Sequence, residues 1–167
     1  KYLTKKAGRN IHDSGTIEIT TNSIEMNNMS HHPKNLVDYK SESYYSSGND
    51  KDIFIRFDFK GNLVQLTDYS LKSWDNSPNG VHIRNWVIEC SNDRVHWDEV
   101  DRRTDCQTLN NSNITATFNC GQKRNNFYRF VQLRQTGYSW YGYPRNNYYF
   151  YFYYIEFFGK LQESSNK

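Results

Sequence analysis

The feature of this sequence that most limits its fold is the alternation of apolar and polar residues over short runs. The clearest run is 53–59, in which Ile53, Ile55, Phe57 and Phe59 occupy every second position. Successive side chains of a β-strand point to opposite faces, so a period of two indicates a half-buried strand. No segment of ten or more residues shows a clean helical period of 3.6. The chain is therefore predicted to be all-β.

Eight runs of this kind are separated by turn residues, at a spacing typical of a sandwich or barrel. The expected strands are residues 16–21, 53–59, 63–72, 85–90, 97–100, 114–120, 127–135 and 148–159. The polar stretch 22–32 is expected to be a loop, and Pro33 can start one helical turn over 33–38.

Composition narrows the class of protein further. The 167 residues suffice for one domain with a hydrophobic core. A net charge of +3, from 21 basic and 18 acidic residues, does not provide the continuous basic face that nucleic-acid binding requires. No apolar run reaches about 18 residues, so no transmembrane helix is expected.

Residue patterns of catalysis and metal binding are missing from the sequence. The three cysteines, Cys90, Cys106 and Cys120, show no C-x₂-C spacing, and adjacent His31 and His32 would aim apart. No phosphate-binding glycine loop or nucleophile elbow is present. We therefore expect no enzymatic activity, no metal and no cofactor. An odd number of cysteines favours reduced thiols and a cytoplasmic location.

Four stretches in order resemble one known family. They are 53–59; 86–93 with the later Trp97; 128–133; and 155–159, which closes on Ile-Glu-Phe-Phe-Gly. Together they are similar to the discoidin domain, also called the coagulation-factor C-type domain, of the galactose-binding-like superfamily. Within this family, the sequence looks most similar to the discoidin-like domains of protist proteins. The resemblance implies an eight-stranded antiparallel jelly-roll sandwich over 16–161, with an N-terminal extension over 1–15 and a tail over 162–167.

The resemblance also implies where a ligand binds. In this family, loops at one end of the sandwich form the usual site, which here corresponds to residues 22–28, 74–79 and 138–145. The expected ligand-binding residues are Asn22, Glu25, Asn27, Asn28, Asp50, Trp74, Asn76, Trp140, Tyr141, Tyr143 and Arg145. The loop 138–145 is unusually aromatic, and we expect Trp140 to be partly exposed there. The alternative is that this loop folds over the sandwich end and buries its own rings.

These observations predict a non-catalytic recognition module. The leading hypothesis is an intracellular domain that binds a protein partner, as part of an adaptor or scaffold. The alternatives are a carbohydrate-binding module, whose partner is a glycan, and an architectural component of a larger assembly. The first loop offers Ile24, Met26 and Met29 but no Trp or Phe spike, so membrane insertion is not expected.

Overall fold

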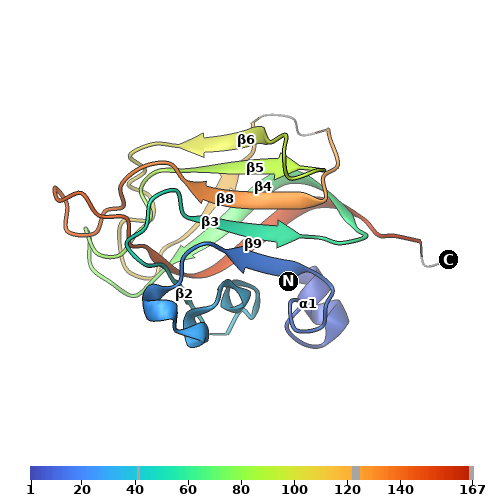
Figure 1. The fold of residues 1–167 in the computed structure, drawn as a ribbon, viewed down its shortest axis with the longest axis horizontal. Helices are drawn as coiled ribbons and strands as arrows, with labels where there is room; N and C mark the ends of the chain where they lie inside the picture. Colours follow the sequence, from blue (N-terminus) through green and yellow to red (C-terminus); the bar gives the residue numbers. More distant parts are fainter. Residues whose placement is uncertain (41, 122–124, 166–167) are drawn as a thin grey trace.

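The chain folds into two antiparallel β-sheets packed face to face, as a computed structural model shows for residues 1–40, 42–121 and 125–165 (Figure 1). The five-stranded sheet has the order β1-β3-β8-β5-β6 and the four-stranded sheet the order β2-β9-β4-β7. The predicted all-β, antiparallel sandwich is confirmed. The described residues form nine strands rather than eight, because a two-residue strand, β2, joins the second sheet.

The strands of the five-stranded sheet are β1 (Glu18–Thr21), β3 (Phe54–Asp58), β8 (Phe130–Gln135), β5 (Trp86–Ser91) and β6 (Asp98–Arg103). The strands of the four-stranded sheet are β2 (Tyr45–Ser46), β9 (Tyr151–Gln162), β4 (Leu63–Ser73) and β7 (Thr115–Asn119). All eight expected strands are present. The expected loop 22–32 contains two short 3₁₀ turns, η1 (Glu25–Asn27) and η2 (Met29–His31), and the turn expected at Pro33 is η3 (Pro33–Val37).

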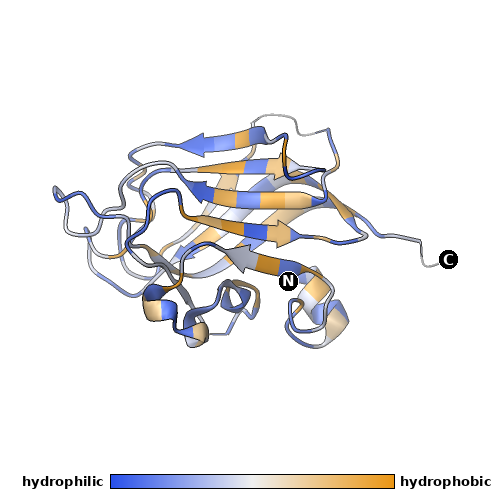
Figure 2. Ribbon diagram, viewed as in Figure 1, coloured by the Kyte–Doolittle hydropathy of each residue, from blue (hydrophilic) through white to orange (hydrophobic). Residues whose placement is uncertain are grey.

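The core lies between the sheets and is built from inward-facing apolar residues of both. In Figure 2, hydrophobic and hydrophilic residues alternate along several strands. On β3, Ile55 and Phe57 are buried, whereas Phe54, Arg56 and Asp58 are partly exposed. The alternation in the sequence therefore marks the face of β3 that packs against the second sheet.

One hydrogen-bonded chain links the two sheets through the core. The indole N–H of Trp86 on β5 donates to the hydroxyl of Tyr69 on β4 (2.9 Å), which donates to Asp101 Oδ2 on β6 (2.5 Å). Arg103 Nε donates to the same Asp101 oxygen (2.9 Å). Burial and the Asp101 carboxylate raise the pKa of Tyr69, so its hydroxyl keeps its proton. The indole N–H of Trp86, the hydroxyl of Tyr69 and the carboxylate of Asp101 thus all have hydrogen-bond partners.

The first fifteen residues pack onto the sandwich. Helix α1 (Tyr2–Ala7) has no buried residue of its own, but Ile11, which follows it, is 5% exposed and belongs to the core. Between α1 and the sheets lies an apolar cavity of about 210 Å³, lined in part by Leu3, Phe57 and Phe157. The segment expected as an N-terminal extension thus covers one edge of the core. In the C-terminal tail, residues 166–167 lie outside the described part of the chain.

Gly159 is the residue whose replacement the sheet tolerates least. It has φ +146°, and a Cβ atom placed on it would lie 1.9 Å from the backbone oxygen of Gln65 on β4. Its partner is Leu66, next to a β-bulge in the β4–β9 pairing. Glycine is required here because any side chain meets backbone, which cannot move aside without breaking the ladder.

We expect Gly159→Ala to lower the free energy of unfolding by about 2–4 kcal/mol, from backbone strain plus overpacking. Gly121→Ala is the matched control, because no atom of the described residues lies within 4 Å of a Cβ there. That change should stay within about 0.5 kcal/mol of the parent. Chemical denaturation of both variants checks this, and equal midpoints would contradict the β4–β9 register.

Candidate functional site

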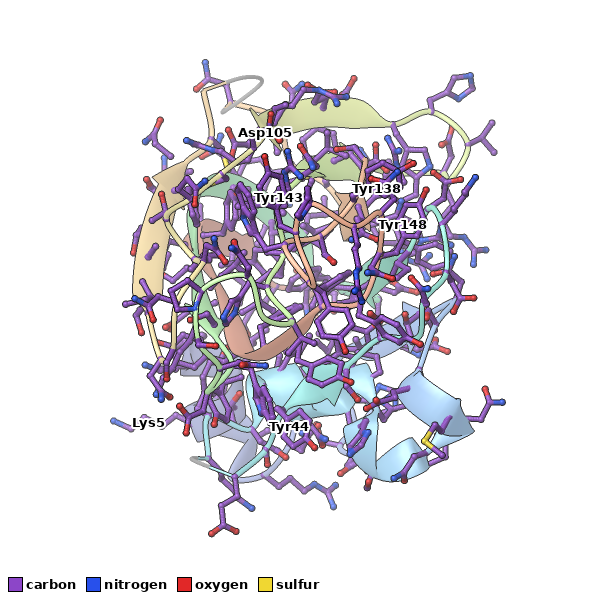
Figure 3. The ribbon with its side chains drawn as sticks, turned by 90° about the vertical axis from the view of Figure 1, so that its left-hand side faces the viewer. Lys5, Tyr44, Asp105, Tyr138, Tyr143 and Tyr148 are labelled. Atoms are coloured by element: carbon purple, nitrogen blue, oxygen red, sulfur yellow. The ribbon has the colours of Figure 1, made fainter. Side chains whose placement is uncertain are left out.

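The three loops expected to form a ligand site meet at one end of the sandwich, on the left of Figure 1. Residues 22–28 follow β1, residues 74–79 follow β4, and residues 138–145 lie between β8 and β9. Figure 3 looks directly onto this end, where Tyr44, Tyr138, Tyr143 and Tyr148 project from several segments. The end carries much aromatic surface.

Four half-buried rings form a continuous cluster at this end, which we call the aromatic platform: Tyr44, Trp74, Tyr151 and Tyr153. The ring centroids of Trp74 lie 5.5 Å from Tyr44 and 5.4 Å from Tyr151. Tyr44 lies 6.3 Å from Tyr151 and 6.5 Å from Tyr153. These tilted and edge-on contacts are the favoured arrangements of aromatic pairs, so the rings hold one another in place.

Strand register explains why these rings share one face. Tyr45, Phe152 and Ser73 lie opposite one another on β2, β9 and β4, and all three are buried. Tyr151 and Tyr153 flank Phe152 on β9, and Tyr44 and Trp74 adjoin Tyr45 and Ser73, so these four rings emerge on the outer side of the four-stranded sheet. A bulge in the pairing between Ser73 and Lys72 leaves Tyr153 without a partner on β4.

Polar groups border the platform on one side. The hydroxyl of Tyr151 donates to Glu25 Oε1, and Glu25 Oε2 lies 3.6 Å from His31 Nδ1. The other ring nitrogen of His31 is 3.1 Å from the hydroxyl of Tyr44. Burial and the Glu25 carboxylate raise the pKa of Tyr151, which therefore stays a neutral hydrogen-bond donor. A carboxylate and an imidazole thus lie at one edge of the platform, where they contact the hydroxyls of two of its rings.

Further rings extend the aromatic surface toward the loop 138–145. Tyr141 meets Tyr149 edge-on at 5.5 Å, and Tyr138 lies 5.0 Å from Tyr148. Tyr138 and Tyr141 are 38% and 41% exposed. The aromatic loop thus presents some of its rings to solvent, as expected.

Trp140 does not present its ring, and the expectation of a partly exposed side chain is wrong. It is 4% exposed, and its indole N–H donates to the carbonyl of Cys106 (3.0 Å). The Arg84 guanidinium lies 4.5 Å from the ring, and Tyr143 covers it at 5.5 Å. Backbone bonding to His82 O (2.9 Å) turns the residue inward. Trp140 anchors the loop to its neighbours.

Two expected binding residues hold the loops before β3. Asn22 Oδ1 accepts from the backbone N–H of Phe54 (2.8 Å), and its Nδ2 donates to Asp52 O (3.1 Å). Asp50 Oδ2 accepts from Ser23 Oγ (2.6 Å). Both side chains thus form hydrogen bonds within the protein that hold these loops in place.

The remaining expected residues are either bonded within their own loops or exposed. Asn28 and Asn76 each accept a backbone N–H close by in the chain, as turn residues commonly do. Asn27 and Arg145 are exposed. Tyr143, 49% exposed, lies over Trp140. Of the residues expected at the site, the structure places Trp74 and Glu25 at the platform.

Three platform residues were not anticipated: Tyr44, Tyr151 and Tyr153. His31, which borders them, was considered only as a metal ligand. A signal for two of the tyrosines exists in the sequence, because Tyr149, Tyr151 and Tyr153 alternate with phenylalanines. That alternation identifies an aromatic face opposite the core. Tyr44 and His31 reach the site only through long-range packing, which no local pattern records.

Two methionines stand out beside the platform. Met26 is 90% exposed and Met29 is 64% exposed. Met26 has a φ of +50°, an uncommon backbone conformation for a side chain of this size. Met26 follows Glu25 in η1, and Met29 begins η2.

The described residues contain no group of three or more His, Cys, Asp or Glu side chains placed to hold a metal ion. Within the same residues, no helix has the length and apolar character needed to cross a membrane.

Several solved structures with this fold are sugar-associated modules. CBM32-3 from a family 31 glycoside hydrolase of Clostridium perfringens has a TM-score of 0.65 at 19% identity, over 89% of this chain and 94% of its own. Another C. perfringens module, CpGH89CBM32-5, in complex with GalNAc-β-1,3-galactose, reaches 0.64 at 10% identity, over 87% and 96%. A fucolectin from striped bass (Morone saxatilis) serum reaches 0.64 at 15%, over 87% and 46%. The chain therefore has the same fold as these proteins, the discoidin-like β-sandwich.

Sequence comparison adds one relative. No model of a known protein family matches the chain. A stretch of 91 residues, 54% of the chain, is 31% identical to the E3 ubiquitin-protein ligase hecd-1 of Caenorhabditis elegans. That stretch corresponds to only 3% of the length of hecd-1.

The burial of Trp140 makes a stability prediction. Trp140→Ala should lower the free energy of unfolding by about 3–5 kcal/mol, as for other buried aromatic residues. Tyr141→Ala removes an exposed ring from the same loop and should cost far less. Urea denaturation of both variants measures the difference. A Trp140→Ala variant as stable as the parent would contradict the inward conformation of the loop.

His82 makes the site end sensitive to pH. It is 1% exposed, and its Nε2 lies 3.0 Å from Asn76 O and 3.1 Å from Ser77 O, so this nitrogen carries the hydrogen. No group of the described residues hydrogen-bonds its buried Nδ1. Burial lowers the pKa of His82 below 6.5, against the opposing effect of the two carbonyls.

The unfolded chain binds a proton at His82 more readily than the folded chain does. The contribution of His82 to the free energy of unfolding is therefore fully present above about pH 6.5, and the free energy of unfolding falls as the pH drops below that value. His82→Gln should flatten the dependence of unfolding free energy on pH between 7.5 and 5.5. The flattening is partial, because burial also lowers the pKa of His32. Identical slopes for parent and variant would show that His82 is not buried as a neutral ring.

Proposed function

We propose that this domain is a non-catalytic carbohydrate-binding module whose site is the aromatic platform. The observation that carries the proposal is the cluster of half-buried rings, Tyr44, Trp74 and Tyr151, with Glu25 and His31 at its edge. Ligand sites commonly combine apolar or aromatic lining with a few placed polar groups. Aromatic rings with polar groups beside them suit a sugar, whose ring has an apolar face and hydroxyls around its rim.

The proteins that share this fold support a sugar ligand over a protein partner. One C. perfringens module with this fold was solved in complex with GalNAc-β-1,3-galactose, and another relative is a fucolectin. Those names describe the relatives, and their low sequence identity transfers only the fold. The ligand of this chain is inferred from its own rings and polar groups.

A protein partner is the second candidate function. Two observations favour it: the exposed Met26 and Met29 beside the platform, and the similarity of part of the chain to hecd-1. Exposed methionines adapt to varied apolar surfaces. The adaptor role and the cytoplasmic location remain predictions, and so does the architectural role.

The test is glycan binding by Trp74→Ala beside Trp97→Ala. Trp97 is a half-buried tryptophan next to the β5–β6 turn, which lies at the other end of the sandwich in Figure 1. A glycan array with the parent domain first identifies a sugar that binds. Trp74→Ala should then weaken that sugar's affinity by about 30-fold or more, the effect of losing a central aromatic contact of about 2 kcal/mol. Trp97→Ala should leave the affinity unchanged.

Failure of the array to find any bound glycan would contradict the proposed function. A sugar whose affinity depends on Trp97 and not on Trp74 would place the site on the opposite sheet. A pull-down with the same two variants tests the protein-binding function separately.

A further inference from the structure

The platform is bordered by a carboxylate that has no lysine or arginine partner. In the described part of the chain, Glu25 forms no ion pair with either residue type, and its one possible cationic partner is His31 at 3.6 Å. Its side chain is 28% exposed. The other carboxylate oxygen accepts from the hydroxyl of Tyr151, which orients the group beside the rings. A negative charge is therefore fixed at the edge of an aromatic surface.

A second carboxylate lies next to Trp74 in the chain. Asp75 follows Trp74 directly, is exposed, and accepts from Ser112 Oγ. Burial raises the pKa of Tyr153 and so does the Asp75 carboxylate, whereas a hydrogen bond with the Asp75 backbone lowers it. Asp75 also has no ion pair among the described residues. The site is thus flanked by two carboxylates, on a protein whose net charge is +3.

The platform already contacts an ammonium group of the protein itself. Lys72 Nζ lies 5.2 Å from the centre of the Tyr153 ring. This contact shows that a ring of the cluster is open to a cation, and it occupies the Tyr153 end. The Glu25 end, where Tyr44, Trp74 and Tyr151 meet, has no such occupant among the described residues.

Resting on the proposed function, we infer that the platform selects sugars that carry a free ammonium group, that is, amino sugars, over their N-acetylated and anionic counterparts. An ammonium over the face of a tyrosine or tryptophan ring is attracted by the negative charge density of that face. A hydrogen bond from an ammonium to a carboxylate is roughly twice as strong as one between neutral groups. N-acetylation removes the charge while keeping the sugar ring. A carboxylated or sulfated sugar meets the like charges of Glu25 and Asp75, which outnumber the one ammonium of Lys72 at the Tyr153 end.

The test compares a glucosamine tetramer with the N-acetylglucosamine tetramer by isothermal titration calorimetry at low salt. We expect the amino form to bind about 10-fold or more tightly, which corresponds to about 1.4 kcal/mol. Glu25→Gln keeps an acceptor for Tyr151 but removes the charge, and should reduce the preference to about threefold or less. Affinity for the amino form should fall by more than affinity for the N-acetylated form.

Two further variants sharpen the result. Asp75→Asn should lower the preference without touching the Glu25–Tyr151 bond. Glu18→Gln removes an exposed carboxylate from β1 that pairs with Lys60, and it should leave the preference intact. If Glu18→Gln and Glu25→Gln act alike, the oligomer binds by net charge and the inference is wrong.

The inference and the proposed function fail differently. Equal binding of the two tetramers, or tighter binding of the N-acetylated form, with both dependent on Trp74, overturns the ammonium preference and leaves a sugar site in place. Binding of neither tetramer, together with an array that finds no other glycan, overturns both.

Discussion

The structure depends on the alternation of side chains along the last strand. Phe150 and Phe152 point into the core, so Tyr149 and Tyr151 between and beside them must point outward. The same few residues therefore fill the sandwich and build the aromatic platform. β9 lies between β2 and β4 in its sheet, and this position brings Tyr44 and Trp74 to the same outer face. The inward side chains of β9 thus pack the core, and its outward side chains form part of the candidate site.

Strand register ties the loop end to the rest of the fold. Gly159 allows β9 to pass close to β4, and the second bulge, at Tyr153, turns one more ring outward. The loop 138–145 is then fastened by backbone bonds from Trp140 to His82 and from Gly142 to Asn79. A neutral, buried His82 is part of that fastening. The platform is thus held in place by the β4–β9 pairing as well as by loops.

The sequence predicts the fold well because strand patterns are local. Each of the eight expected strands carries its own alternation or apolar run, and all eight form. β2 was missed because its two residues, Tyr45 and Ser46, are a strand only through pairing with β9, more than a hundred positions away. No local pattern specifies such a strand.

The site is predicted less well, for the same physical reason. Trp140 was expected at the surface because its loop is rich in turn residues. Its burial is set by Arg84, Cys106 and Tyr143, whose positions follow from the tertiary fold. Glu25 and Trp74 were anticipated from their loops, and both lie at the platform. His31 and Tyr44 meet there only because η3 and β2 pack beside β9.

The most direct test of the account is an NMR titration that follows the indole N–H signals of the four tryptophans. Trp86 and Trp140 are buried, Trp97 lies near the other end of the sandwich, and Trp74 belongs to the platform. On titration with the glucosamine tetramer or with GalNAc-β-1,3-galactose, the account predicts a saturable shift of the Trp74 signal with the Trp86 and Trp97 signals unmoved. A saturable shift of Trp97 with Trp74 unchanged would contradict it.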